Sequence, residues 1–228
     1  INFNRLIQNK VDLKEEIDKI HKYQIAYRKV MEEYKEANML PVYNAGFISL
    51  DKQFLTIGIN GMVEAAESLG IEPGNNIVYK EWVSSQLKII YDANKAIKAK
   101  TGYMFNTEFV PAENLWIKNA KWDRADGYKV NRDCYNSYFY VVEDEGTTTI
   151  DKFDMHWKDM IQYLDWGSAL HLNTEELLSK EAFKKLLRLS ADKGCNYFCT
   201  NTKITICNDC GYIDKTTQQY CHKCNSRN

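Results

Sequence analysis

Two cysteine pairs near the end of the 228-residue chain constrain its fold more than any other feature. The stretch CNDCGYIDKTTQQYCHKC places Cys207 and Cys210 in one Cys-x-x-Cys turn and Cys221 and Cys224 in a second. Zn²⁺ prefers four tetrahedral thiolates, and this spacing predicts a Cys₄ zinc site, which is structural because no coordination position stays open. His222 lies inside the second turn and is expected to remain outside the metal's ligand set. Free thiols, or disulfides formed during purification, are the alternative.

The amino-acid composition also favours reduced thiols that bind a metal ion. Seven cysteines occur without a secretion signal, which favours metal binding over a disulfide framework. The formal net charge is −1, from 30 basic and 31 acidic residues, so no overall field attracts nucleic acid or an anionic membrane. No apolar run reaches the roughly 18 residues of a membrane span, and we expect a cytoplasmic protein. The first residue is Ile1 rather than Met, which suggests a processed, trimmed or split polypeptide.

The region before the cysteines alternates between helical and strand patterns. Helices are predicted over residues 11–39, 61–70, 78–100, 151–165 and 174–190. Strands or buried runs are predicted over 45–50, 55–60, 103–110, 135–142 and 168–172. Such alternation favours parallel βαβ units in an α/β sheet or barrel. We therefore predict one α/β domain over residues 1–192 and a small cysteine-rich module over 193–228. A zinc site contributes about 10–16 kcal/mol in peptides, enough to fold a module with little core.

The remaining cysteines and two histidines fit structural roles. Cys195 and Cys199 could form a second metal half-site or a redox pair, but burial is favoured because no further cysteine pair accompanies them. Cys134 has no base beside it in the sequence, which argues against a nucleophile. His156 and His171 lie beside apolar residues, a setting typical of core histidines rather than of ligands or bases.

Two loops could face a ligand. In TIGINGMVEAAESLG, Gly58 and Gly61 lie between a strand and a helix, where amides could face a phosphate, although steric need alone explains the glycines better. In NTEFVPAENLWIKNAKWDRADGY, a strand runs into a proline-led loop, the place where α/β folds bind ligands, and its amides and basic side chains suit an anionic nucleotide. A charge-rich helix anchored by Trp116 and Trp122 explains that stretch equally well.

Taken together, these segments resemble the C-terminal half of anaerobic (class III) ribonucleoside-triphosphate reductase, most closely the phage form. The resemblance is carried, in this order, by AGFISLDKQFLTIGINGMVEAAESLG, TEFVPAENLWIKNAKWD, the run around CYNSYFY, DWGSALHL and GCNYFCTNTKITICNDCGYIDKTTQQYCHKC. It extends over essentially the whole chain, and its most specific parts are the GING turn and the terminal cysteine block.

The resemblance implies a glycyl-radical enzyme whose ten-stranded α/β barrel is accompanied by a small zinc-ribbon-like module. In such an enzyme a glycine radical near the C-terminus removes hydrogen from a cysteine on a loop inside the barrel. The thiyl radical then abstracts the 3′ hydrogen of a ribonucleotide, and the 2′ hydroxyl leaves as water. Formate often supplies the reducing equivalents, a radical-SAM activase installs the radical, and ATP and deoxynucleotides regulate the full enzyme.

Specific residues of this chain match the family's motifs. The zinc ligands correspond to Cys207, Cys210, Cys221 and Cys224. The loop that faces the substrate's phosphates corresponds to Pro111, Ala112, Glu113, Asn114 and Leu115. The thiyl cysteine and effector region are expected upstream of Ile1, and the radical glycine downstream of Asn228. The chain is therefore expected to lack both radical carriers, to need the rest of the reductase as its partner, and to be inactive alone.

A zinc-ribbon module that binds nucleic acid or protein is the competing interpretation. Its support is a group of basic residues in the tail, namely Lys193, Lys203, Lys215, Lys223 and Arg227. The near-neutral chain and the lack of aromatic residues interleaved with these basic ones argue against nucleic acid.

Overall fold

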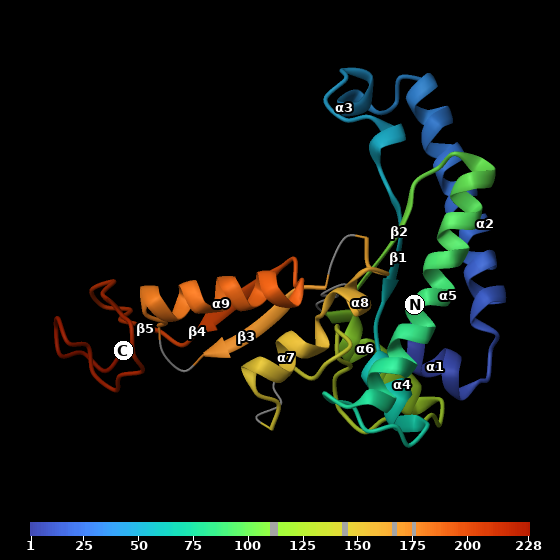
Figure 1. Ribbon diagram of the computed structural model, residues 1–228. Helices are drawn as coiled ribbons and strands as arrows, with labels where there is room; N and C mark the ends of the chain where they lie inside the picture. The colour runs from blue at the N-terminus through green and yellow to red at the C-terminus, as the bar shows by residue number, and fades with distance from the viewer. Residues whose placement is uncertain (110–113, 143–145, 166–167, 175–176) are drawn as a thin grey trace. The chain divides into compact units, whose positions relative to one another are not determined.

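A computed structural model describes residues 1–109, 114–142, 146–165, 168–174 and 177–228 (Figure 1). The chain divides into two units, one formed by Ile1–Val141 with Asp159–Ser168 and the other by Val142–Lys158 with Ala169–Asn228. The expected boundary at residue 192 falls inside the second unit, and a separate module from residue 193 stays a prediction.

The first unit is built on two parallel strands joined through helices. Its elements are α1 (Phe3–Gln8), α2 (Leu13–Glu36), α3 (Pro41–Asn44), the 3₁₀ turn η1 (Leu50–Lys52), β1 (Leu55–Ile59), α4 (Met62–Ser68), α5 (Ile77–Thr101), β2 (Phe105–Phe109) and α6 (Asn114–Ala125). The strands pair in parallel, with Leu55 opposite Phe105 and Ile59 opposite Phe109, and Figure 1 shows α2 and α5 beside each other. The strands expected near 55–60 and 103–110 and the three helices expected before residue 101 are confirmed.

Local side chains decide where the two long helices begin and end. The Asp12 carboxylate accepts a hydrogen bond from the Glu15 amide at 2.9 Å and starts α2. Asn76 does the same for Tyr79 at 2.8 Å and starts α5, which ends at Gly102 with φ 77°. Although α2 and α5 have 24 and 25 residues, no helix in the described part of the chain is both long and apolar enough to cross a membrane.

The core of the first unit lies between these helices and one face of the strand pair. Its fully buried members include Ile17, Ile57, Ile59, Val83, Leu87 and Ile90. A buried polar chain crosses the same layer, because His21 Nε2 lies 2.8 Å from Asn94 Oδ1 and Asn94 Nδ2 donates to Thr107 Oγ1 at 2.9 Å. Each buried aliphatic side chain stabilises the fold by about 1.5–3 kcal/mol, so apolar burial holds this unit.

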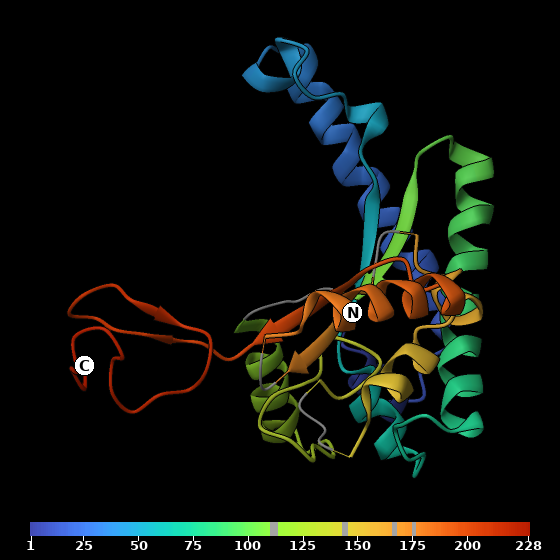
Figure 2. The same cartoon turned by 60° about the vertical axis from the view of Figure 1, so that its left-hand side comes forward.

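The second unit repeats the parallel arrangement on a smaller scale. Its elements are α7 (Thr149–Met155), β3 (Leu170–Thr174), α9 (Lys180–Lys193), β4 (Phe198–Thr202), β5 (Thr205–Ile206) and β6 (Ile213–Asp214), and α8 (Lys158–Ile161) lies where the chain passes from one unit to the other. β3 and β4 pair in parallel, with α9 between them in sequence, and the Phe198 ring packs on Phe153 at 5.5 Å. β5 and β6 form an antiparallel hairpin, which Figure 2 shows among the loops near the chain end.

Several predicted elements differ in the structure. Residues 45–50 are not a strand but a turn that leads into η1, with Gly46 at φ 81°. Residues 135–142 form no strand either: the four residues 137–140 are all buried, but they lie in an irregular segment that belongs to none of the strands described. The helix expected over 151–165 is interrupted at His156 and Trp157. The one expected from 174 begins at Lys180, where the Ser179 side chain caps it, and Thr174 belongs to β3.

Candidate functional site

Equivalent backbone hydrogen bonds close both cysteine turns. In the first turn the Gly211 amide donates to the Cys207 carbonyl at 2.9 Å, and in the second the Asn225 amide donates to the Cys221 carbonyl at 2.8 Å. Gly211 and Asn225 both have left-handed backbones, with φ of 68° and 59°. Glycine and asparagine are the residues that adopt this conformation most readily, so the sequence after each second cysteine is suited to the turn.

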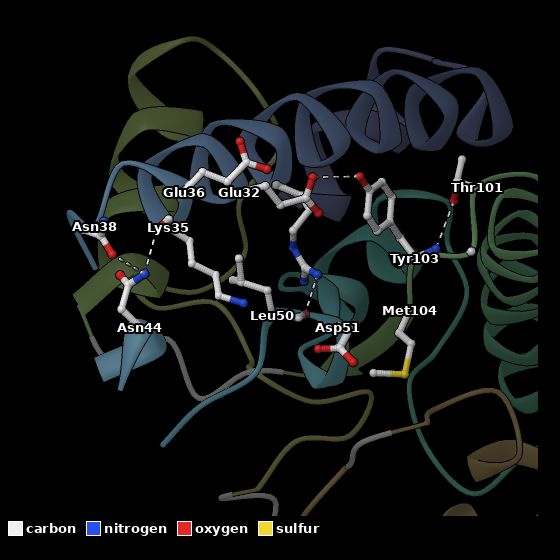
Figure 3. A pocket seen from close by; sticks show the side chains of 12 residues that line it. Glu32, Lys35, Glu36, Asn38, Asn44, Leu50, Asp51, Thr101, Tyr103 and Met104 are labelled. Carbon is white, nitrogen blue, oxygen red and sulfur yellow. Dashed lines mark hydrogen bonds between the residues drawn. The ribbon is translucent and has the colours of Figure 1, made fainter. Parts of the chain in front are cut away.

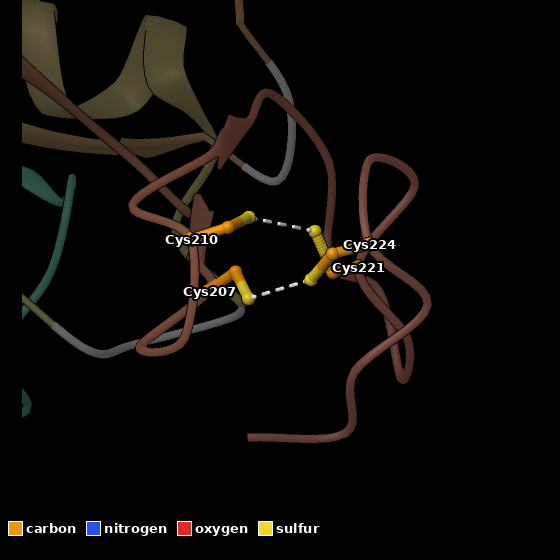
Figure 4. A group of neighbouring side chains, drawn as sticks. All are labelled: Cys207, Cys210, Cys221 and Cys224. Atoms are coloured by element: carbon orange, nitrogen blue, oxygen red, sulfur yellow. Dashed lines mark hydrogen bonds between the residues drawn. The ribbon is translucent and has the colours of Figure 1, made fainter.

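The four thiols converge on one point (Figure 4). Cys207 Sγ lies 3.6 Å from Cys224 Sγ, Cys210 Sγ lies 3.5 Å from Cys221 Sγ, and all four sulfurs lie within 4.8 Å of one another. Tetrahedral Zn–S bonds of about 2.3 Å place sulfurs about 3.8 Å apart. The geometry fits that requirement, so the cluster could hold a metal ion such as zinc.

The thiols influence one another's protonation. Burial acts to raise the pKa of Cys221, but the amides of Cys224 and Lys223 and the neighbouring thiols outweigh it and bring that pKa to about 6. The Ser226 amide acts to lower the pKa of Cys224, yet Cys210, burial and the other thiols raise it to about 12. One thiol thus ionises readily while another keeps its proton, because adjacent thiolates repel. A divalent cation removes this repulsion, which couples metal binding to proton release.

Polar contacts fasten the two turns to each other and to the hairpin. The Asp209 carboxylate accepts hydrogen bonds from the Ser226 hydroxyl and, at 3.0 Å, from Asn228 Nδ2. His222 Nδ1 lies 2.7 Å from Asp214 Oδ2 at the end of β6. His222 is therefore engaged by a carboxylate rather than directed at the sulfurs, in agreement with the expectation that it is not a ligand.

The predicted phosphate loop is only partly within the described residues. Pro111, Ala112 and Glu113 lie outside them. Asn114 and Leu115 are the first two residues of α6, and both are exposed. β2 ends at Phe109, so α6 begins shortly after the carboxyl end of a parallel strand. Trp122 is 55% exposed, so it does not anchor α6 in the way the alternative interpretation requires.

The glycine turn after β1 has a steric explanation. Gly61 has φ 79°, and a Cβ there would lie 3.0 Å from a ring carbon of Tyr135. Three residues later Glu64 is buried, and its Oε1 accepts hydrogen bonds from the amide and the Nδ2 of Asn136 at 3.0 and 2.7 Å. Burial raises the pKa of Glu64 despite these bonds. The turn thus fixes the end of β1, and no phosphate is needed to explain its glycine.

A polar cluster on β3 and β4 was missed by the sequence analysis. In register, Cys199 lies opposite His171 and Asn201 opposite Asn173. Cys199 Sγ is 3.1 Å from His171 Nδ1, and Asn201 Nδ2 donates to Asn173 Oδ1 at 2.9 Å. The two leucines of β3 alternate with these residues and are buried. The alternation of apolar and polar residues in LHLN was the signal that β3 carries one polar face.

The other cysteines and histidines divide into expected and unexpected cases. Cys195 is buried, and His156 is fully buried with its pKa lowered by that burial to about 3, as expected for core residues. Burial of Cys199 and a core position for His171 were wrong expectations, because both are half-exposed on a polar face. Among the described residues the terminal cysteine quartet is the one group of three or more potential metal ligands.

Comparison with known families identifies the chain. A model of the anaerobic ribonucleoside-triphosphate reductase family matches residues 1–228. The chain belongs to this family. The resemblance inferred from the sequence is thereby confirmed at the level of the family. No curated protein sequence gives a significant match.

Solved structures of anaerobic ribonucleotide reductase share the fold. The Thermotoga maritima enzyme with dATP bound in the specificity site matches with a TM-score of 0.85 and 25% identity, over 100% of this chain and 40% of that one. The same enzyme with glycerol in the active site matches with a TM-score of 0.88 and 26% identity, over 100% and 39%. The chain therefore has a mixed α/β fold that corresponds to part of the reductase, and it spans about 40% of the length of these structures.

The chain also has a pocket of about 670 Å³ in its first unit (Figure 3). It lies near the amino ends of β1 and β2, and its charged lining residues are Arg28, Glu32, Lys35, Glu36 and Asp51. The buried Arg28 guanidinium donates to the carbonyls of Leu50 and Gln53 at 2.5 and 2.7 Å. Parallel sheets bind ligands beyond the carboxyl ends of their strands, so this pocket is at the opposite end, and its arginine holds the segment before β1.

Proposed function

We propose that this chain forms part of the catalytic barrel of an anaerobic ribonucleoside-triphosphate reductase, which converts ribonucleotides to 2′-deoxyribonucleotides by glycyl and thiyl radical chemistry. The observation that carries the proposal is the family match over residues 1–228, together with reductase structures of which the chain spans about 40%. Its contribution would be barrel wall, a loop for the substrate's phosphates and a structural zinc site. The activity is that of an oxidoreductase that supplies deoxyribonucleotides for DNA replication.

The two parallel strand pairs support a barrel with a polar interior. The face of β1–β2 that packs on α2 and α5 is apolar except for Thr107, and the other face carries Thr56, Asn106 and Glu108. Burial raises the pKa of the Glu108 carboxyl. The second pair has buried leucines on one face and, on the other, His171, Asn173, Cys199 and Asn201. A ten-stranded barrel is wider than the eight-stranded kind that side chains fill, so polar inward residues could line a substrate cavity.

The substrate's phosphates would bind at the loop formed by Pro111, Ala112, Glu113, Asn114 and Leu115. This assignment is supported by the resemblance of the loop to the family's motif. The position of Asn114 and Leu115 at the start of the 12-residue helix α6 also supports it, because amides at a helix N-terminus favour anions.

The cysteine quartet would hold one Zn²⁺ as a structural ion. Four thiolates fill a tetrahedral shell, so the ion would contribute rigidity and no Lewis-acid chemistry. Such a site orders a segment that has little apolar core of its own. In the reductase this would give a firm base for the loop that carries the glycine radical.

The radical carriers would come from parts of the reductase outside these 228 residues. Cys134 is exposed, which does not suit a radical-carrying thiol inside a barrel that excludes water. The partners would then be the N-terminal half, the radical-glycine segment and a radical-SAM activase, with the whole assembly in the cytoplasm. These 228 residues alone would be inactive. A zinc-ribbon module for nucleic acid or protein is not favoured, because the family match covers far more than the cysteine-rich tail.

The test is ribonucleotide reduction by the assembly that carries this chain. After anaerobic activation, the assembly is expected to convert a ribonucleoside triphosphate to its deoxy form, and the 228 residues alone are expected to form none. Because Cys221 is one of the four zinc ligands, a Cys221→Ser assembly is expected to lose activity, whereas Cys134→Ser is the matched control and should keep it. An activated assembly that retains zinc yet forms no deoxynucleotide would contradict the proposal.

A further inference from the structure

We propose that His171, Asn173, Cys199 and Asn201 form a recognition surface for the uncharged part of the ribonucleotide, its sugar or base. The inference rests on the reductase function proposed above and assigns residues of this chain to contact with the substrate. These four residues are called the polar quartet below.

The position of the polar quartet in the sheet favours a ligand. β3 ends at Thr174 and β4 at Thr202, so Asn173 and Asn201 lie one residue before the carboxyl ends of two parallel strands. Ligands of open and closed parallel sheets bind at these ends. Both asparagines are exposed, and His171 and Cys199 are half-exposed, so the surface is accessible within its own unit.

The hydrogen bonds inside the polar quartet leave a donor and an acceptor for a ligand. Asn201 Nδ2 donates to Asn173 Oδ1 at 2.9 Å and lies 3.3 Å from His171 Nδ1. Among the described residues, the one hydrogen-bond donor near Asn201 Oδ1 is the Cys199 thiol, at 3.9 Å. Asn173 Nδ2 has no hydrogen-bond acceptor among the described residues. An amide donor beside an amide acceptor matches a pair of ribose hydroxyls or the edge of a base.

The polar quartet has no permanently charged side chain, so it is suited to the nucleoside part of the substrate rather than to its phosphates. It contains no lysine, arginine, aspartate or glutamate, so it offers no strong counter-ion for a triphosphate. Two amides, a thiol and an imidazole instead suit neutral hydroxyl and amide groups. We therefore expect the phosphates to bind at a different part of the chain. Binding of the nucleoside and binding of the phosphates can be tested separately.

Cys199 gives a direct probe of occupancy. The activated assembly is treated anaerobically with iodoacetamide, and the alkylation rate of each cysteine is followed by peptide mass spectrometry, with exposed Cys134 as internal reference. A ribonucleoside triphosphate at about ten times its Kd is expected to slow alkylation of Cys199 about tenfold and to leave Cys134 unchanged. If dATP protects Cys199 equally well, the surface belongs to an effector and the assignment to substrate is overturned.

Variants of the two asparagines test recognition by kinetics. Asn173→Leu and Asn201→Leu each remove the amide groups, and each is expected to raise KM about tenfold with a smaller change in kcat. Thr200→Val is the matched control, because Thr200 belongs to β4 but alternates with the polar quartet onto the other face. Zinc content and far-UV circular dichroism verify that each variant is folded. If a leucine variant fails to fold, the milder substitution Asn201→Ala is measured in its place.

The outcomes separate this inference from the proposed function. If the wild-type assembly neither binds nor reduces ribonucleotides, the proposed function fails and the inference falls with it. If the assembly reduces ribonucleotides while Cys199 alkylation and the KM of both asparagine variants stay unchanged, the inference alone is overturned.

Discussion

The β1–β2 sheet and the cysteine turns keep their shapes by different means. Around β1 and β2, side chains such as Ile57, Ile59 and Leu87 are at most 2% exposed. The β5–β6 hairpin has two residues in each strand, and Ile206 and Ile213 are 54% and 57% exposed. Apolar burial therefore accounts for the first region and cannot account for the second.

This difference indicates how much stabilisation a metal ion held by the four sulfurs would have to contribute. Fixing the backbone of each residue costs about 1–2 kcal/mol, and the residues from 205 to the end bury little apolar surface to offset it. Polar contacts such as Asp209 with Ser226 are exposed and contribute little by themselves. A bound metal ion would provide the missing stabilisation, so the two regions should respond to different perturbations.

Metal removal should give the largest contrast. Chelation, or Cys221→Ser, is expected to remove about 10–16 kcal/mol of apparent stabilisation from residues 205–228 and to leave the first unit folded. Amide hydrogen exchange measured on both regions checks this, with Cys134→Ser as the control that keeps its metal. Protection of residues 205–228 that survives complete metal removal would show that the polar contacts suffice.

Acid should weaken the core of the second unit through His156. Its pKa is about 3 in the folded state, against an ordinary value of 6.5, because burial disfavours the charged ring. Stability from this group is therefore present above pH 6.5 and is lost as pH falls toward 3, by about 1.4 kcal/mol for each pH unit. Urea unfolding at pH 7 and pH 5, followed by hydrogen exchange in α7 and β3, is expected to show a smaller loss in His156→Gln. An equal loss in both proteins would assign the effect to other groups.

A core truncation should affect only the first unit. Leu87→Ala is expected to destabilise it by about 2–5 kcal/mol, because α5 loses a fully buried side chain. Denaturant unfolding of the first unit measures this change, and zinc content should stay the same. The neighbouring surface substitution Lys88→Ala is the control, with an expected effect below about 0.5 kcal/mol. Zinc loss from Leu87→Ala would mean that the two regions are not independent.

The smallest effect concerns the two turns themselves. Gly211 and Asn225 occupy equivalent left-handed positions, and a Cβ on Gly211 would meet no atom within 4 Å. Gly211→Asn should therefore weaken zinc binding less than about fivefold in a chelator competition, since asparagine tolerates this backbone. Gly211→Val should weaken it more, because a branched side chain is strained there. If both substitutions weaken zinc binding equally, the left-handed backbone at Gly211 does not matter for the site, and the two turns are not equivalent.

Sequence patterns predicted the parts of the molecule whose structure depends on residues close together in the sequence. The helices α2 and α5 were predicted from the spacing of their apolar residues, and the cysteine quartet from the spacing of its cysteines. The segment at residues 135–142 was misassigned, because its aromatic residues are buried by packing that no local period encodes. The pairing of His171 with Cys199 depends on strand register between residues distant in sequence, although the alternating pattern of β3 was visible.

The most direct test of the account is native mass spectrometry of the anaerobic assembly that carries these residues, with its metal content. We expect one zinc ion for each copy of the chain and, in the same assembly, the rest of a reductase. A zinc-free chain that stands alone and keeps residues 205–228 protected from hydrogen exchange would contradict both the metal-dependent module and the role in a reductase.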